Sequence, residues 1–512
     1  MRKLCLVMAL VAPCGMMAQK AANPTTYANS ITAEDLKKHL YIIAGAEMEG
    51  RETATEGQRK AAAYIENHFK QLGLAPGVNG GYQQPYPVFQ DSLVKASIEV
   101  NGKKFAPFTD FAVNLGGSNT SAFLGSEVVF VGYGISDSTR DDYKGIDAKG
   151  KIVLVLAGTP PAAAQPAAGA PRRGFAVNPV LDAAAKNGAI AVFQVQAGFP
   201  RRAGAARGFQ YTNGFRKANY PNLYAVSDQL AESIMGTDYA PAKEAMKAGN
   251  PVAKAYTANV AVELVKYITA LESTNVIGFL EGTDKKDEYV FITAHYDHIG
   301  KTAAGVINYG ADDDGSGTVS VLELAEAFVK AKAAGKGPRR SIVFMTVSGE
   351  EKGLWGSAWY GDHPVYPLDK TTVDLNIDMI GRIDPKRTIG DSTNYVYVVG
   401  DDKLSSDLRP ISEAMNKKYI KMELDYKYND PKDTERIYYR SDHYNFARKG
   451  VPIIFYFNGT HADYHRPGDT PDKIGYELMA KRAKLVFYTA WEMANRNDML
   501  KRDIPLDPNA VR

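Results

Sequence analysis

Cysteine is nearly absent from this 512-residue chain, which contains only Cys5 and Cys14. Both lie in an N-terminal stretch, residues 1–22, most of which we expect to be removed. The mature chain would then have no thiol and could form no disulfide. Its stability must therefore come from buried apolar surface, with help from any bound metal.

The N-terminal stretch has the pattern of a secretory signal peptide. Two basic residues precede a short apolar segment, which is followed by the small residue Ala18. The segment is shorter than the about 20 residues that a membrane-spanning helix needs. We therefore expect cleavage of residues 1–18 and export to the periplasm or the extracellular space. Lipid attachment at Cys14 is the alternative, which Pro13 disfavours.

A strong charge imbalance is also missing. Lys and Arg number 61 against 58 Asp and Glu, which gives a net charge of +3. Nucleic-acid-binding domains carry clustered positive charge, so this balance indicates no nucleic-acid partner. No later segment is long and apolar enough to span a membrane. The complete phosphate-loop pattern G-x-x-x-x-G-K-[S/T] is absent, which removes support for nucleotide hydrolysis. None of these features bears on the oligomeric state.

Length and composition predict a globular protein of two or three domains. Hydrophobic residues make up 45% of the chain and charged residues 23%, as in ordinary soluble proteins. Residues 32–74 have helical apolar periodicity, and Thr32 with Asp35 resembles a capping box. Residues 95–120 have strand-like and loop-like patterns.

The middle of the chain, about 125–260, has a different composition and apolar pattern. Residues 183–188 predict the end of a helix. The Ala/Pro-rich stretch 159–174 has no core-forming pattern, and we expect an exposed loop. Short apolar segments rich in β-branched residues predict strands at 128–135, 151–158 and 189–196.

From about residue 265, strands and helices alternate. Residues 318–334 have an amphipathic helical pattern between two strands. The strands are nearly continuous apolar runs, typical of strands covered on both faces: 288–294, 341–347, 373–380, 395–400 and 451–457. This order predicts an α/β fold, a three-layer sandwich with a mainly parallel mixed sheet.

Unusual polar residues follow these strands. Binding sites in parallel sheets gather at the carboxyl ends of the strands. Four of the eight histidines of the chain lie in these segments: His295, His298, His461 and His465. The acidic residues that accompany them are Asp297, Asp312, Asp313, Asp314, Glu350, Glu351 and Asp378.

This combination of side chains predicts a metal site. Zinc binds imidazole nitrogen and carboxylate oxygen, and a catalytic zinc keeps one position open for water. Two neighbouring metals need a carboxylate shared between them. A metal-bound histidine commonly donates its other ring N–H to a carboxylate, and Asp297 lies two residues after His295.

The adjacent pair Glu350–Glu351 follows the apolar run 341–347. Two neighbouring carboxylates repel each other unless cations lie close by. We interpret the pair as two separate roles. One glutamate binds metal, and the other stays free to take the proton of a metal-activated water.

The chain resembles the co-catalytic di-zinc exopeptidase family that includes bacterial leucyl aminopeptidases and glutamate carboxypeptidase II. The motifs occur in one order: AHYDHIG, GADDDGSG, SGEEKGLWGS, LNIDMIG, SDHYNFARKGVP and YHRPGDT. The resemblance implies a discontinuous peptidase domain over residues 30–120 and 265–500. Residues 125–260, through VVFVGYGI and DYKGIDAKGKIVLVL, resemble an inserted, β-rich protease-associated domain.

The resemblance implies two Zn²⁺ ions per chain, with Asp313 shared between them. His295 and Asp378 would complete the first set of ligands. Glu351 and His465 would complete the second set.

The resemblance also implies roles for two carboxylates outside the ligand set. Glu350 would be the general base. Asp297 would orient the ring of His295. A further implication is a cis peptide bond between Asp313 and Asp314.

Other polar residues are expected outside the ligand set. For His298 we favour a structural contact, whereas His461 fits either the pocket mouth or a structural role. Asp442 and His443 are expected to support the site or contact substrate. The basic loop 200–217 fits a solvated loop, with a substrate-contacting arm as the alternative.

The implied function is a secreted zinc aminopeptidase that removes N-terminal residues from peptide substrates. Three alternatives stay open. A carboxypeptidase of the same family would need a cationic group for the terminal carboxylate. A glutaminyl cyclase would bind a single zinc ion. A non-catalytic protein would bind peptide without cleaving it.

Overall fold

The computed structural model describes residues 23–138, 140–158, 160, 178–200, 208–214 and 220–506. Three features of the sequence lie outside these residues. They are the expected signal peptide with both cysteines, the stretch 159–174 apart from Pro160, and the basic side chains Arg201, Arg202, Arg207, Arg216 and Lys217.

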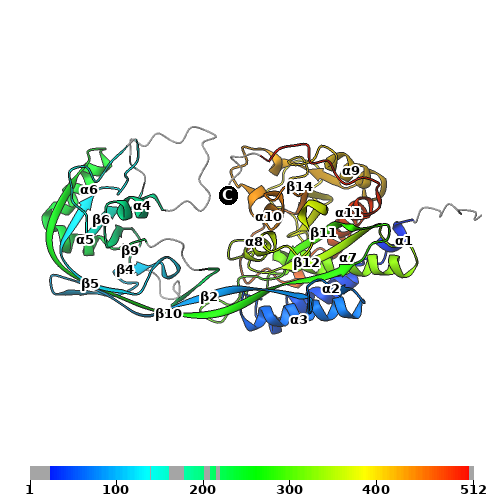
Figure 1. Ribbon diagram of the computed structural model, residues 1–512, viewed down its shortest axis with the longest axis horizontal. Coiled ribbons are helices and arrows are strands. Elements are labelled where there is room, and N and C mark those ends of the chain that lie inside the picture. Colours follow the sequence, from blue (N-terminus) through cyan, green and yellow to red (C-terminus); the bar gives the residue numbers. More distant parts are fainter. Residues whose placement is uncertain are drawn as a thin grey trace, which may run out of the picture.

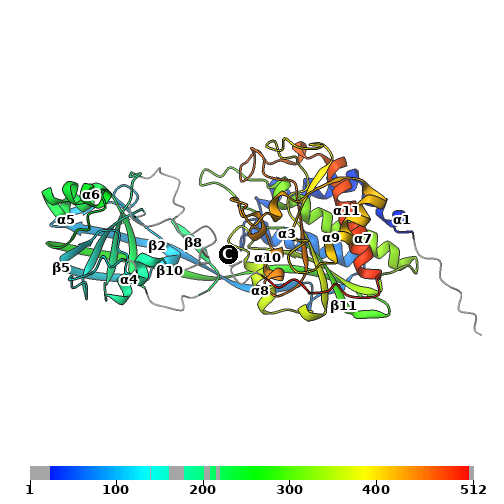
Figure 2. The same cartoon turned by 90° about the horizontal axis from the view of Figure 1, so that it is seen from above.

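Two long strands join a larger and a smaller lobe (Figures 1 and 2). β2 (Gln83–Val100) and β10 (Ala253–Leu280) run antiparallel and pair from one lobe into the other. The core of the larger lobe draws on residues 28–82 and 276–500. The core of the smaller lobe draws on residues 98–264. The smaller lobe is therefore inserted within the sequence of the larger one.

The sheet of the larger lobe is mainly parallel. β11, β12, β13 and β16 run in one direction, whereas β10 is antiparallel to β12 and β14 is antiparallel to β16. The predicted α/β fold with a mixed sheet is confirmed. In spatial order the strands are β15 (Glu423–Asp425), β14 (Tyr395–Val399), β16 (Ile453–Phe457), β13 (Thr371–Ile377), β11 (Lys285–His295), β12 (Arg340–Val347) and β10.

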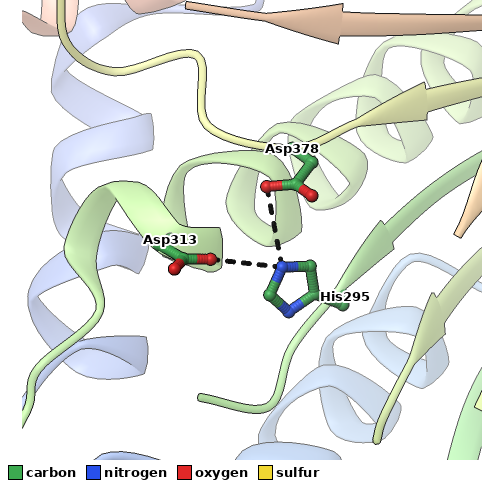
Figure 3. Close-up of side chains that lie close together, drawn as sticks. All are labelled: His295, Asp313 and Asp378. Atoms are coloured by element: carbon green, nitrogen blue, oxygen red, sulfur yellow. Dashed lines mark ion pairs between the residues drawn. The ribbon is translucent and has the colours of Figure 1, made fainter. Parts of the chain in front are cut away.

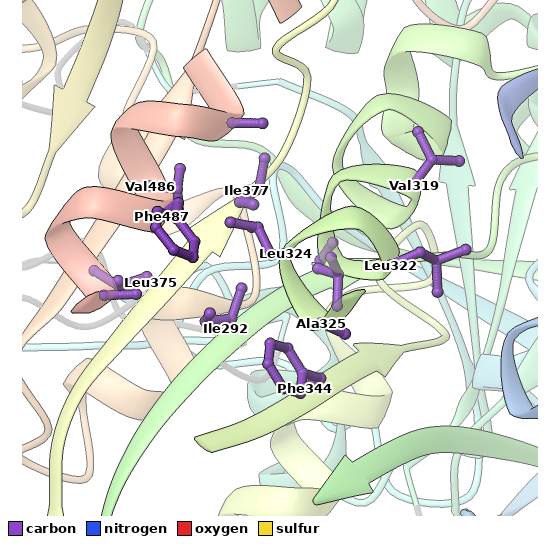
Figure 4. Packing of buried hydrophobic residues seen from close by; sticks show 14 of the residues in the cluster. Ile292, Val319, Leu322, Leu324, Ala325, Phe344, Leu375, Ile377, Val486 and Phe487 are labelled. Carbon is purple, nitrogen blue, oxygen red and sulfur yellow. The ribbon is translucent and has the colours of Figure 1, made fainter. Parts of the chain in front are cut away.

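Helices cover one face of this sheet with a large apolar core (Figure 4). Ile292, Phe344 and Leu375 project from the strands toward Leu324 and Phe487 on two of the helices. Each is fully buried, which accounts for the continuous apolar runs of the sequence. The helices of this layer are α1 (Thr25–Ala28), α2 (Ala33–Ile43), α3 (Glu56–Gln71), α7 (Gly317–Ala333), α9 (Leu408–Met415) and α11 (Tyr476–Asn495).

The opposite face of the sheet has a second core. Phe291 and Val343 point away from the side chains next to them in sequence, because successive residues of a strand face opposite sides. They pack with Tyr360 of α8 (Trp355–Asp362) and Phe446 of α10 (His443–Ala447). Three layers result, as the sequence predicts.

The helical prediction for residues 32–74 is correct at its start and wrong in the middle. The N–H of Asp35 donates to Thr32 Oγ1 at 3.1 Å, the expected cap of α2. Residues 44–55 then form turns that separate α2 from α3. Glu49, Arg51 and Ala54 have positive φ angles there, which no helix accommodates.

The smaller lobe has its own sheet and helices. In spatial order its strands are β5 (Ser121–Val131), β6 (Ile152–Leu156), β7 (Ala191–Val195), β9 (Asn222–Val226) and β4 (Phe111–Val113). Its helices are α4 (Pro179–Lys186), α5 (Asp228–Met235) and α6 (Tyr239–Lys247). Short strands add to the joining ribbon: β1 (Ala75–Pro76) on β10, and β3 (Lys103–Phe105) and β8 (Phe209–Thr212) on β2. The resemblance of this lobe to a protease-associated domain stays a prediction.

The helices of the described residues include none that could span a membrane. None of them combines the length and the apolar composition that a crossing would need.

Candidate metal centre

The carboxyl ends of the parallel strands bring the predicted site together. β11 ends at His295, β12 ends just before the turn with the two glutamates, and β13 ends just before Asp378. The turn that starts α7 supplies Asp313. Chain segments more than 80 residues apart in sequence therefore meet at one edge of the sheet, the edge at which parallel folds bind ligands.

His295, Asp313 and Asp378 form a first group (Figure 3). His295 Nε2 lies 3.3 Å from Asp313 Oδ1 and 3.6 Å from Asp378 Oδ1. All three side chains are buried, and their ligand atoms are close enough to hold one metal ion.

Asp297 lies beside the ring of His295, but its contact differs from the expected one. His295 Nδ1 is 3.1 Å from the backbone carbonyl of Asp297, whereas its carboxylate is 3.7 Å away. That carboxylate instead accepts hydrogen bonds from Thr53 Oγ1 at 2.7 Å and from the N–H of Glu350 at 3.2 Å. Asp297 therefore connects the His295 loop to the Glu350 turn.

Asp313 is also part of a second group. His465 Nε2 lies 3.0 Å from Asp313 Oδ2 and 3.1 Å from Glu351 Oε2. His298 approaches the same two carboxylates, with Nδ1 at 2.8 Å from Glu351 Oε1 and 3.8 Å from Asp313 Oδ2. His298, Asp313 and Glu351 form a set that could hold a metal ion. The structure thus places four protein side chains in the second group, where the sequence implied three.

The donor atoms of both groups fit bound cations. His295 Nε2, Asp313 Oδ2, Glu351 Oε1 and both ring nitrogens of His298 are buried and have no hydrogen bond among the described residues. Buried polar atoms normally have partners, and a cluster of exceptions points to a missing one. Imidazole and carboxylate together are the donors that zinc prefers.

The three aspartates of GADDDGSG each have a different partner. Asp312 accepts a hydrogen bond from the N–H of Gly381 at 2.7 Å and lies 3.1 Å from His461 Nε2. Asp313 is shared by the two groups, and its peptide bond to Asp314 is cis, as expected. Asp314 accepts from the N–H of Met379 at 3.0 Å, which fixes the end of β13 against the start of α7.

The adjacent carboxyls of Glu350 and Glu351 have pKa values shifted in opposite directions, raised for Glu350 and lowered for Glu351. Burial raises the pKa of the Glu350 carboxyl well above its usual range, although the His295 ring opposes this. Burial acts on Asp313 too, but hydrogen bonds from His295 and His465 outweigh it and hold the pKa well below the usual range. Glu350 belongs to neither ligand group, and its raised pKa favours a carboxyl that can take up a proton.

Two supporting residues of the site were not predicted. Arg51 is fully buried, and its guanidinium donates to the carbonyls of Ile43, Tyr296 and Tyr309 at 2.7–2.9 Å. The carboxylate of Asp469 accepts the backbone N–H groups of Asp312 and Asp313 at 3.0–3.1 Å. Asp469 belongs to the motif YHRPGDT, so its place in that motif is the one signal that could have indicated it.

Asp442 and His443 are fully buried and belong to neither ligand group. Asp442 accepts a hydrogen bond from Ser357, and burial raises the pKa of its carboxyl to about 7. His443 Nε2 lies 2.7 Å from the carbonyl of Tyr438. Neither residue is exposed, so both support the loops around the site.

A cavity opens beside the first group and Glu350. It occupies about 350 Å³, counting the space at its open mouth. Ile437, Phe455 and Phe457 supply apolar walls, and Arg440 and Tyr464 line it too. Apolar walls with a few polar groups are typical of ligand pockets.

Fold and site together define an α/β protein with a candidate two-metal centre at the carboxyl edge of its sheet. Residues 275–490 match the sequence profile of Peptidase family M28.

Curated relatives resemble part of the chain. A probable leucine aminopeptidase of Trichophyton verrucosum is 32% identical over 241 residues, 46% of this chain and 60% of the relative. A probable zinc metalloprotease of Pyricularia oryzae is 27% identical, over 46% of this chain and 53% of the relative. The chain therefore spans less than two thirds of the length of these relatives.

Solved structures resemble nearly the whole fold. An aminopeptidase from Aneurinibacillus sp. strain AM-1 superposes with a TM-score of 0.59 at 22% identity, over 95% of this chain and 99% of that one. A zinc aminopeptidase from Bacillus subtilis superposes with a TM-score of 0.55 at 19% identity, over 93% and 99%. At these identities the likeness is one of fold.

Proposed function

We propose that this chain is an exported zinc-dependent exopeptidase, an aminopeptidase that binds two Zn²⁺ ions and removes N-terminal residues from peptides. The observation that carries the proposal is a buried aspartate, Asp313, shared by two histidine–carboxylate groups, with Glu350 beside them and free of both. The relatives and the structural neighbours described as aminopeptidases support this activity. Export rests on the predicted signal peptide alone.

The residues of the chain would divide the chemistry as follows. When bound, zinc supplies an acidified water and polarises the scissile carbonyl. Glu350 takes the proton of the attacking water and returns it to the leaving amine. Asp313, with its lowered pKa, stays ionised as the shared ligand. Asp297 holds the Glu350 turn through the backbone N–H of Glu350.

Substitution of the general base tests the role of Glu350. Glu350→Gln should lower kcat for leucine p-nitroanilide by at least about 100-fold, because a carboxamide cannot accept the proton. It should keep the same zinc content by atomic absorption, since Glu350 is in neither ligand group. Glu232→Gln, the same change on an exposed residue of the smaller lobe, is the control. Near-normal turnover in Glu350→Gln would refute the role.

A panel of peptides with the zinc-loaded mature chain separates the alternatives. Cleavage of free but not acetylated N-termini, with two zinc ions per chain, is the expected result. Equal cleavage of acetylated peptides would indicate a carboxypeptidase. One zinc ion and pyroglutamate from an N-terminal glutamine would indicate a cyclase, and binding without cleavage would indicate a peptide-binding protein.

A further inference from the structure

Arg440 is the basic residue among the described side chains that line the cavity beside the metal centre. It lies at the exposed mouth, on the segment that also brings Ile437 to the cavity wall. Among the described residues the cavity is therefore lined by carboxylates, by apolar side chains and by one exposed cation.

The guanidinium of Arg440 has N–H donors that no carboxylate of the described residues accepts. Its Nη2 donates to Tyr464 Oη at 3.3 Å, and within the described part of the chain no carboxylate forms an ion pair with it. Two other arginines of the larger lobe are paired with carboxylates: Arg382 lies 3.1 Å from Asp463, and Arg409 lies 2.8 Å from Asp401. A guanidinium presents five N–H groups in a fork that matches a carboxylate, so Arg440 can accept a further anionic partner.

Tyr464 links Arg440 to the second ligand group. Its ring stacks on that of His465 at 3.9 Å between centroids. His465 in turn contacts Asp313 and Glu351. Arg440 is therefore connected to the second ligand group through one hydrogen bond and one ring stack.

The charge of Arg440 is not needed to balance the centre. Two Zn²⁺ ions would balance the four carboxylates Asp313, Glu350, Glu351 and Asp378. An unpaired guanidinium at the rim then favours a ligand that carries a negative charge of its own.

We propose that Arg440 binds the C-terminal carboxylate of a short peptide, so that dipeptides with an apolar first residue are preferred substrates. This inference rests on the proposed aminopeptidase function. The apolar walls of Ile437, Phe455 and Phe457 suit the first side chain. The second residue of a dipeptide carries its carboxylate toward the mouth, one residue beyond the scissile bond. A cavity of about 350 Å³, including its mouth, suits a ligand of this size.

A carboxylate could also come from the side chain of an acidic first residue. The walls around that side chain would be apolar and would not replace its lost hydration. Arg440 lies at the exposed mouth instead. The terminal carboxylate is therefore the source that the arrangement favours.

The test compares kcat/KM for four substrates in the zinc-loaded mature chain: leucyl-leucine, leucyl-leucine amide, leucine p-nitroanilide and glutamate p-nitroanilide. Arg440→Gln should lower kcat/KM for leucyl-leucine by about tenfold or more, because a charge-assisted pair is lost. The amide and leucine p-nitroanilide should change by less than about twofold. The kcat/KM of Arg440→Lys for leucyl-leucine should lie between the values of the unaltered chain and of Arg440→Gln, since lysine keeps the charge without the fork. Arg448→Gln, an exposed arginine outside the cavity, is the matched control.

Each other outcome overturns the assignment. Equal losses for leucyl-leucine and its amide would show that Arg440 does not recognise the terminal carboxylate. A loss confined to glutamate p-nitroanilide would assign it to an acidic side chain. Hydrolysis of leucine p-nitroanilide by the unaltered chain reports the proposed function separately.

The affinity for leucyl-leucine, measured by calorimetry, tests the same contact without turnover. Measured in the Glu350→Gln background, Arg440→Gln should weaken binding of the free acid by about tenfold relative to the amide. If acid and amide respond alike there, the proposal fails even where no hydrolysis is measurable.

Discussion

His298 and His465 approach the same two carboxylates from different loops. His298 is fully buried, whereas the side chain of His465 is 38% exposed. His298 Nδ1 lies closer to Glu351 than His465 Nε2 does, at 2.8 Å against 3.1 Å. A purely structural histidine would have a hydrogen-bond partner outside the ligand set, and among the described residues neither of its ring nitrogens has one.

Loss of the His298 ring should therefore weaken the second metal position. We expect His298→Ala to lower affinity for one of the two zinc ions by about 10- to 100-fold, as when residues that orient metal ligands are lost. Zinc retained after dialysis against a weak chelator, measured by atomic absorption, tests this. His363→Ala, an exposed histidine at the end of α8, is the control. Two zinc ions of unchanged affinity in His298→Ala would leave His298 with a packing role only.

The residues of the site differ in how far sequence could find them. His295, Asp313, Glu351, Asp378 and His465 stand in motifs whose order alone suggests a metal centre. Arg51 and Asp469 act through backbone groups far away in the chain, so their roles could not be assigned from sequence, although Asp469 stands in the motif YHRPGDT. The role of Asp297 was foreseen only in part, because which atom contacts a ring depends on the turn that follows β11.

Arg51 ties together elements that the metal centre depends on. Its guanidinium joins the end of α2, the end of β11 and the turn before Asp312 through four hydrogen bonds to carbonyls. The positive φ of Arg51 is part of the turn that separates α2 from α3 and directs the side chain inward. A helix continuous over residues 32–74 could not place it there.

Removal of these donors should destabilise the larger lobe. Arg51→Met would leave buried carbonyls unpaired, and each unpaired group costs about 1–3 kcal/mol. We expect a total loss of more than about 3 kcal/mol in the free energy of unfolding, read from the denaturation midpoint in urea. Arg59→Met, on the exposed side of α3, should change it by less than about 0.5 kcal/mol. Similar midpoints for the two variants would rule out this role.

Elements were easier to predict than their lengths. The strands of the larger lobe are buried on both faces and therefore appear as short apolar runs that sequence alone delimits well. β10 is different: it spans 28 residues because it crosses from one lobe to the other and changes partners along the way. Its partners are set by the arrangement of the lobes, which no local periodicity encodes.

The two lobes meet close to the metal-binding turn. β8 pairs with β2, and its Tyr211 ring lies 5.5 Å from Lys352 Nζ. Lys352 directly follows Glu351 and forms an ion pair with Glu52 at 2.8 Å. Glu52 in turn pairs through its backbone with His298. A segment that sequence analysis placed in the inserted region thus contacts the neighbour of a zinc-ligand candidate.

This contact predicts that the smaller lobe tunes the activity of the larger one. Tyr211→Ala removes a cation–π contact worth about 0.5–1 kcal/mol, so we expect kcat/KM for leucine p-nitroanilide to fall about two- to fivefold. Tyr211→Phe keeps the ring and should keep the activity. Both variants should unfold at the same temperature, because Tyr211 lies at the edge of the small cluster around Tyr86 and outside the main cores. If the alanine and phenylalanine variants have the same activity, the contact between Tyr211 and Lys352 does not tune the metal-binding turn.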